Sequence, residues 1–315
     1  MESACRAPAR LRAVQTFDFY RFRFFFQAID PVQFPPGQAP NIVRGAFGKI
    51  LREVAPPETY AFLFEPAAPG AGSAGLADWP RPFVLRCSHL DGSAPEPGES
   101  FFLDAHIFEI DRPLLPCFRA VFEQFAAQGI GPGRGRVELT AVQQLDLDGN
   151  PTLASTPSSV PLDGEPTPVP SVTLRFVTAT ELKAGGRVSD RPDFAVLFAR
   201  LYERINTLRS LYGLEPSDRR QRPPASHSAA AAIRLTRCDL TWEYASRKST
   251  RTGQTHPLGG FSGEADYEGE LAEFLPWLRA ARWVGVGRQT VWGKGDVRVI
   301  EPGAGTPLLT QATPR

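Results

Sequence analysis

The chain has 315 residues, of which 42% are hydrophobic and 22% are charged, so it is long enough for two domains with separate cores. Its formal net charge of +1 excludes a wholly basic nucleic-acid binder, although a local basic patch is compatible with this balance. The sequence has no run of about 18 apolar residues and therefore predicts no membrane span.

The four cysteines are scattered along the chain, and none forms a CxxC pair. The N-terminus lacks an apolar stretch typical of a signal peptide, so we expect a reduced, cytoplasmic protein. Of the 35 basic residues, four are lysines, which leaves 31 arginines. The planar guanidinium of arginine can form two hydrogen bonds to a phosphate and can stack on bases. A codon bias toward arginine explains the preference for arginine over lysine equally well.

The first half of the chain predicts six elements. Alternating phenylalanines at residues 17–26 are typical of a strand with one or both faces covered. Apolar residues at helical spacing predict a helix over residues 41–54. Strands are expected at residues 83–85, 100–110 and 136–145, and a second helix runs from Pro113 to a stop at Gly129. The order is strand, helix, strand, strand, helix, strand.

The second half repeats this order. Strands are expected at residues 172–180, 233–244, 260–267 and 297–300, with helices at about 192–212 and 270–280. Two copies of β-α-β-β-α-β predict an α+β protein of two tandem ferredoxin-like (RRM-like) domains. We expect an N-terminal domain at residues 1–150, a Pro/Ser/Thr-rich linker or excursion at 151–170, a C-terminal domain at 171–302 and a disordered tail at 303–315.

Each half carries a glycine-rich turn between its second helix and last strand, at residues 129–136 and 285–295. In the second turn, glycines permit positive φ and bring a ligand close to exposed N–H groups, while Arg288 and Lys294 supply charge. The glycines concerned are Gly285, Gly287, Gly293 and Gly295. Phosphate or sugar is the natural ligand, and a purely structural connection is the alternative. The turn precedes a strand, which disfavours a dinucleotide fingerprint and excludes a P-loop.

A second basic segment is predicted as a hairpin tip ahead of residue 259. Arg247, Lys248 and Arg251 place three positive charges within five residues without a carboxylate, and His256 closes the segment. Such a tip could track a phosphate backbone, and a solvated edge is the alternative.

The other histidines and aromatic residues carry weaker signals. His106 lies inside an apolar strand and is expected as a core or face residue, whereas His89 and His227 lie in expected loops with no signature around them. Trp283 and Trp292 are expected to pack under a loop rather than stack on bases. The carboxylates Asp266, Glu268 and Glu270 indicate a metal only weakly, so we predict neither a metal nor a cofactor.

Several of these motifs together resemble a known family. The turn at residues 285–295 resembles the signature loop of the RAMP superfamily of CRISPR proteins. Residues 41–48 and 62–66 are similar to N-terminal segments of the CRISPR repeat endoribonucleases. In the second half, residues 246–249, 259–264 and 271–278 lead into the loop in the order expected for that family.

The resemblance implies binding of a CRISPR repeat transcript and its metal-independent cleavage. A ribose 2′-hydroxyl would attack the adjacent phosphate and leave a 2′,3′-cyclic phosphate and a 5′-hydroxyl. This chemistry needs a base, an acid and a cation. Many relatives have a histidine on or just after the first helix and another just before Val286. This chain has basic residues on that helix and Gly285 at the second position.

The resemblance assigns the candidate residues as follows. Arg44 and Lys49 would hold the scissile phosphate, and His256 is the candidate acid or base. The candidate RNA-binding residues are Arg52, Arg247, Lys248, Arg251, Gly285, Gly287, Arg288, Gly293, Lys294 and Gly295. Expected partners are repeat RNA and other CRISPR effector-complex subunits, without a membrane. One alternative is a non-catalytic RAMP subunit that binds guide RNA, and a more distant one is a metabolic or regulatory protein with duplicated ferredoxin-like domains.

Overall fold

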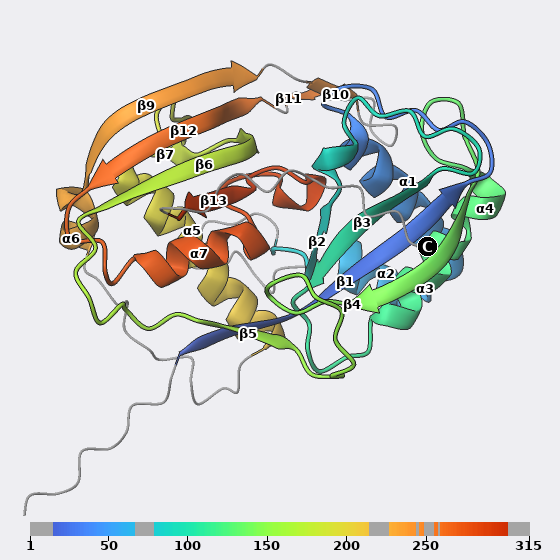
Figure 1. The fold of residues 1–315 in the computed structure, drawn as a ribbon, viewed down its shortest axis with the longest axis horizontal. Helices are drawn as coiled ribbons and strands as arrows, with labels where there is room; N and C mark the ends of the chain where they lie inside the picture. Colours follow the sequence, from blue (N-terminus) through green and yellow to red (C-terminus); the bar gives the residue numbers. More distant parts are fainter. Residues whose placement is uncertain are drawn as a thin grey trace, which may run out of the picture.

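The computed structural model describes residues 15–66, 79–213, 227–243, 246–248, 255–257 and 259–301. In these residues the chain forms two main antiparallel sheets that lie side by side, with helices covering one face of each (Figure 1). The element types follow from the alternation of apolar residues in the strands and from their helical spacing in the helices.

The N-terminal half has one sheet with the strand order β2-β3-β1-β4. Its elements are β1 (Thr16–Ala28), α1 (Ala39–Val54), α2 (Pro57–Phe64), β2 (Phe83–Arg86), η1 (Ser88–Leu90), β3 (Ser100–Ile107), α3 (Leu115–Glu123), α4 (Phe125–Gln128) and β4 (Val137–Gln144). In this order the first and third strands are central, as the predicted ferredoxin-like fold requires.

The C-terminal half repeats the same arrangement as β13-β6-β12-β9. Its main elements are β6 (Ser171–Thr180), α5 (Phe194–Tyr212), α6 (His227–Ala232), β9 (Arg234–Glu243), β12 (Gly260–Glu268), α7 (Leu275–Val284), η3 (Thr290–Trp292) and β13 (Val297–Ile300). Two short hairpins add β7 (Lys183–Ala184) with β8 (Arg187–Val188), and β10 (Ser246–Lys248) with β11 (Thr255–Pro257). The predicted tandem ferredoxin-like fold is therefore confirmed.

Several details differ from the sequence-based expectation, and the helix expected from Pro113 to Gly129 is divided into α3 and α4. The helix expected at residues 270–280 begins only at Leu275, with Pro276 in its first turn, because proline has no N–H to donate and suits only that end of a helix. The helices α2 and α6 and the hairpin of β7 and β8 were not predicted. The segment 151–170 contains the strand β5 (Ser158–Pro161), which pairs with the first residues of β1. Residues 303–315 lie outside the described residues, and the domain boundaries stay a prediction.

The long strand β1 contributes to both cores. Phe17 and Phe19 are buried in the cluster around α5 and α7, whereas Phe22, Phe24 and Phe26 are buried in the cluster around α1 and α3. Successive side chains on a strand point to opposite faces, so the change from odd to even positions turns the two sets of rings in opposite directions. The two halves are therefore tied together by apolar packing along one strand.

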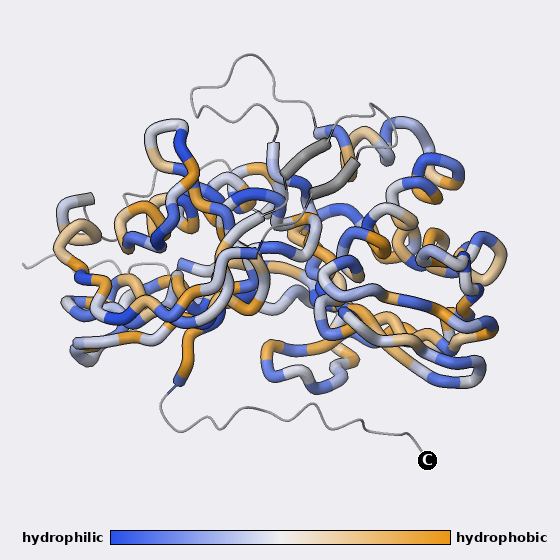
Figure 2. Tube along the Cα trace, turned by 90° about the horizontal axis from the view of Figure 1, so that it is seen from above, coloured by the Kyte–Doolittle hydropathy of each residue, from blue (hydrophilic) through white to orange (hydrophobic). Residues whose placement is uncertain are grey.

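Apolar and polar residues are interleaved along the elements of both halves and do not gather into one apolar tract (Figure 2). Among the helices described, none combines the length and the apolar character needed to cross a membrane.

Candidate functional site

The two glycine-rich turns are closed in the same way. The Ile130 N–H donates to the Gly135 carbonyl and the Val286 N–H donates to the Gly295 carbonyl, each at 2.9 Å. Gly129 and Gly285 end the preceding helices with φ values of 67° and 75°, a conformation that side chains disfavour. The predicted equivalence of the two turns is thus a feature of the fold.

The second turn packs into the N-terminal half of the protein. Val291 belongs to the N-terminal core, and Trp292 lies against the Arg44 guanidinium, whose carbon is 4.2 Å from the ring centroid. A Cβ atom at Gly293 would lie 2.6 Å from the Cβ of Pro40, at the start of α1. This glycine therefore allows the turn to meet α1 closely.

The backbone of this turn is largely occupied by the protein itself. Gly285, Gly293 and Gly295 are buried, and their N–H groups donate to the carbonyls of Ala281, Thr290 and Ala179. The expectation that these three N–H groups are exposed to a ligand is wrong, because they complete the packing of the turn. Their contact with RNA, and that of the half-buried Gly287, stays a prediction.

The basic residues predicted on the first helix do not gather at one place. Arg44 is 9% exposed and lies between the rings of Phe64 and Trp292. Lys49 is exposed, with its Nζ 3.2 Å from the Oε1 of Gln128, and Arg52 is exposed beside Tyr60. None of these three basic residues lines the cleft between the halves. Their roles as phosphate ligands stay predictions.

The basic hairpin is described only in part. The Cα of Arg247 pairs with that of His256 across β10 and β11, whereas Arg251 lies outside the described residues. The side chains of Arg247, Lys248 and His256 are not described, so their predicted roles are untested by geometry. Of the charged residues in the glycine-rich turn, Arg288 forms an ion pair with Glu181, and Lys294 lines the cleft.

A cleft of about 1290 Å³ lies between the two halves and takes its lining from both sheets and from α7. In the described part of the chain, seven arginines line it: Arg21, Arg23, Arg86, Arg175, Arg279, Arg282 and Arg298. Arg175 pairs with Glu264, and Arg279 pairs with Glu165 and Glu301. Other carboxylates also line the cleft, so any positive surplus is local.

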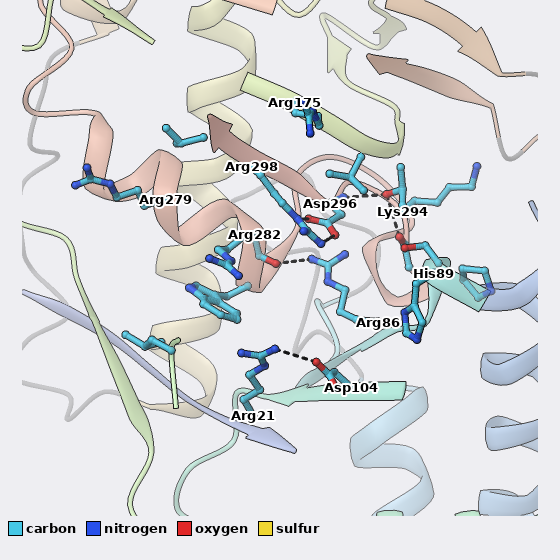
Figure 3. A pocket seen from close by; sticks show the side chains of 18 of the residues that line it. Arg21, Arg86, His89, Asp104, Arg175, Arg279, Arg282, Lys294, Asp296 and Arg298 are labelled. Atoms are coloured by element: carbon cyan, nitrogen blue, oxygen red, sulfur yellow. Dashed lines mark hydrogen bonds and ion pairs between the residues drawn. The ribbon is translucent and has the colours of Figure 1, made fainter. Parts of the chain in front are cut away.

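The remaining five arginines gather where β1, β2, α7 and β13 meet, and Figure 3 shows four of them facing one another across the cleft. Asp104 and Asp296 are the carboxylates that pair with members of this group. Five guanidinium groups against two carboxylates leave a local surplus of three positive charges. We call this group, Arg21, Arg23, Arg86, Arg282 and Arg298, the arginine cluster.

Asp104 positions the two arginines of β1. Its Oδ2 accepts from Arg21 at 3.1 Å and from Arg23 at 3.0 Å, and its Oδ1 accepts from Arg23 Nε at 2.7 Å. Burial raises the pKa of Asp104, but the hydrogen bond and charge of Arg23 and the charge of Arg21 outweigh it, so the pKa lies below its ordinary value of 3.8. Asp104 is therefore a fixed anion.

Of the other three arginines, Arg86 joins the two halves. Arg86 on β2 donates to the Arg282 carbonyl at the end of α7 at 3.0 Å, and Arg298 pairs with Asp296 at 2.9 Å. The Arg86 Nε and Nη1 are buried and have no hydrogen-bond partner among the described residues, and burial lowers the pKa of this side chain. The Arg282 guanidinium lies 4.2 Å from the centroid of the Trp283 ring. Cations held this rigidly suit a polyanion.

Two histidines with described side chains occupy different environments. His106 is 3% exposed, its Nδ1 lies 2.9 Å from the Trp283 carbonyl oxygen, and burial lowers its pKa to about 3, which confirms it as a core residue. His89 is exposed and lines the cleft, stacked on the ring of Phe102. No local motif marks His89, because its neighbour comes from another strand. The described residues contain no cluster of potential metal ligands.

Fold and cleft together define a duplicated ferredoxin-like protein with a basic cluster suited to a polyanion. Residues 174–297 match the family model described as CRISPR-associated endoribonuclease Cas6, and residues 17–162 match a model described as an N-terminal domain. The predicted resemblance is thereby confirmed for the C-terminal half, whose residues 174–297 are similar to that endoribonuclease family.

The solved structures agree in fold. Thermus thermophilus Cas6 gives a TM-score of 0.54 at 18% identity, over 91% of this chain and 100% of its own. A Cas6 product complex gives 0.57 at 20% identity, over 90% and 100%. A partial Cas6-RT-Cas1–Cas2 complex gives 0.57 at 13% identity, over 94% of this chain and 48% of that one. No curated protein matches the chain.

Proposed function

We propose that this protein binds CRISPR repeat RNA in the cleft between its halves and cleaves the precursor transcript into guide RNAs. The observation that carries the proposal is the arginine cluster, with its five guanidinium groups and two carboxylates. The family match of residues 174–297 supports RNA as the polyanion, and one of the solved structures with the same fold is a Cas6 protein in complex with its product.

The proposed chemistry needs no metal. A ribose 2′-hydroxyl attacks the adjacent phosphorus, and the bond to the 5′-oxygen breaks, which leaves a 2′,3′-cyclic phosphate and a 5′-hydroxyl. Charge builds on the phosphate oxygens during the attack, and fixed guanidinium groups stabilise that charge without reorganising. Because Arg44, Lys49 and Arg52 lie outside the cleft, we assign the scissile phosphate to the arginine cluster. The hairpin with Arg247, Lys248, Arg251 and His256 is proposed to hold flanking RNA.

A test incubates the purified protein with its repeat RNA in excess EDTA and maps the ends of the fragments. We expect a single cut with a 2′,3′-cyclic phosphate, and no cut in RNA with a 2′-deoxyribose at that position. Loss of cleavage in EDTA, restored by a divalent cation, would contradict the metal-independent mechanism.

A second candidate function is a non-catalytic subunit that binds guide RNA, with the other effector subunits as partners. The observation that favours it is the absence of histidine on α1, where many members of the family carry one. Tight binding of repeat RNA, together with no product after long incubation of the folded protein, would select this function.

A further inference from the structure

His89 is a histidine of the cleft that none of the sequence motifs marks. It lies in the short helix η1, directly after β2, and its exposed side chain lines the same cleft as the arginine cluster. Figure 3 shows it among the side chains on the N-terminal side of the cleft, to which Asp104 also belongs. It is therefore within the space that a bound RNA strand would occupy.

The His89 ring is held in one orientation by two contacts. It stacks on Phe102 with 4.4 Å between the ring centroids and 25° between the planes, and its Nε2 lies 2.9 Å from the Phe102 carbonyl oxygen. Arg23 lies over the Phe102 ring at 3.9 Å, so the phenyl ring contacts both a guanidinium and an imidazole. Such stacking restricts the rotation of the imidazole beyond what the hydrogen bond alone would do.

The hydrogen bond also decides which nitrogen is basic. A carbonyl oxygen can only accept, so Nε2 carries the hydrogen and the Nδ1 of the neutral ring has a lone pair. No hydrogen bond to Nδ1 is formed by the described residues. The ring thus presents a proton acceptor from a fixed position.

The surroundings of His89 favour the neutral ring. Desolvation by the neighbouring protein lowers its pKa below the ordinary 6.5, the Phe102 carbonyl and Asp104 raise it, and Arg23 and Arg298 lower it, with a net decrease. These groups come from β1, β3 and β13, the three strands that carry charged groups toward the ring. An imidazole that is neutral near pH 7 can accept a proton.

We propose that His89 is a catalytic residue of the proposed cleavage reaction, and that its Nδ1 accepts the proton of the attacking 2′-hydroxyl. The 2′-oxygen forms a bond to phosphorus, and the electron pair of the breaking bond goes to the 5′-oxygen. That oxygen takes a proton from solvent water, and the His89 imidazolium returns its proton to solvent. The inference rests on the proposed function and adds the base that α1 lacks.

The experiment compares wild type, His89→Ala, His89→Gln and His227→Ala under single-turnover conditions with repeat RNA in EDTA. Affinity is measured in parallel with RNA that has a 2′-deoxyribose at the cut. We expect His89→Ala and His89→Gln to cleave about 10²–10⁴-fold more slowly than wild type, with affinity within about threefold of wild type. His227→Ala is the histidine control, because it changes a residue of α6, and should cleave at the wild-type rate.

Two further readouts separate catalysis from a structural role. Added imidazole should partly restore the rate of His89→Ala, and the decrease of the wild-type rate toward acidic pH should disappear in His89→Gln. Wild-type rates in both His89 variants would overturn the role of His89 and leave the proposed function standing. A wild-type protein that binds but never cleaves the RNA would overturn the proposed function, and with it this role.

Discussion

Asp104 is the residue on which the geometry of the arginine cluster depends most directly. It accepts hydrogen bonds from both Arg21 and Arg23, and only 8% of its side chain is exposed. Replacing it by asparagine would leave two largely buried guanidinium groups without a counter-charge. We expect Asp104→Asn to lower the free energy of unfolding at pH 7 by about 3 kcal/mol, measured by urea denaturation.

The ion pairs of Asp104 with Arg21 and Arg23 also predict how the free energy of unfolding depends on pH. The pKa of Asp104 is depressed in the folded protein, so its stabilising effect is fully present above the unfolded pKa of 3.8 and is lost as the pH falls through the folded value. The difference in unfolding free energy between wild type and Asp104→Asn should therefore be constant from about pH 7 to pH 5 and narrow below about pH 4. A difference that grows on acidification would contradict this role.

Arg44 illustrates how a charged residue in a family motif can have a packing role. Its guanidinium lies between Phe64 and Trp292 at 9% exposure, so its loss should weaken the contact between α1 and the glycine-rich turn. We expect Arg44→Gln to lower the free energy of unfolding by about 1–2 kcal/mol. Unchanged stability together with abolished cleavage would instead support the sequence-based catalytic assignment.

At the scale of the element, the glycine-rich turn acts as a connection between the halves. Gly293 has a φ of 73° and faces Pro40, whereas Gly37 has a φ of 70° with no atom near the position of a Cβ. Gly37→Ala therefore measures the cost of the backbone conformation alone, about 1 kcal/mol. We expect Gly293→Ala to cost about 1–3 kcal/mol more in thermal or urea unfolding. If Gly37→Ala and Gly293→Ala lowered the free energy of unfolding equally, the contact of Gly293 with Pro40 would be unimportant.

The strands and long helices could be predicted from sequence because periodicity is a local property. β3 and α5 begin within two residues of the expected positions. β5 could not be predicted, since its four residues Ser158–Pro161 include one buried apolar side chain, and its pairing with β1 depends on the fold. The position of the glycine-rich turn could also be predicted, but its contact with Pro40 joins distant parts of the chain.

The candidate site was much less predictable than the fold. Arg21, Arg86 and Arg298 appear in the sequence as ordinary strand residues, and no spacing between them suggests a common site. Their proximity follows from the packing of one sheet beside the other, and the stacking of His89 on Phe102 follows from the pairing of β2 with β3. The basic residues on α1 formed the clearer local pattern, yet the fold places them outside the cleft.

At the scale of the whole molecule, the local surplus of positive charge in the arginine cluster predicts salt-sensitive RNA binding. Each phosphate neutralised on a single strand contributes about −0.7 to the slope of log affinity against log salt. Arg282→Gln should reduce the magnitude of this slope by about 0.7 and weaken binding. The matched control is Arg119→Gln on α3, whose side chain is 64% exposed and pairs with Glu123, and it should leave the slope unchanged.

The central claim is that RNA lies in the cleft between the two halves, and ultraviolet crosslinking tests it most directly. Wild-type protein is bound to repeat RNA that has a 2′-deoxyribose at the cut, irradiated, digested and analysed by mass spectrometry. We predict crosslinked peptides from β1, η1 with β3, and the end of α7, around Arg23, Phe102 and Trp283. Crosslinks confined to the α1 surface around Lys49 and Arg52, with none in the cleft, would contradict the claim.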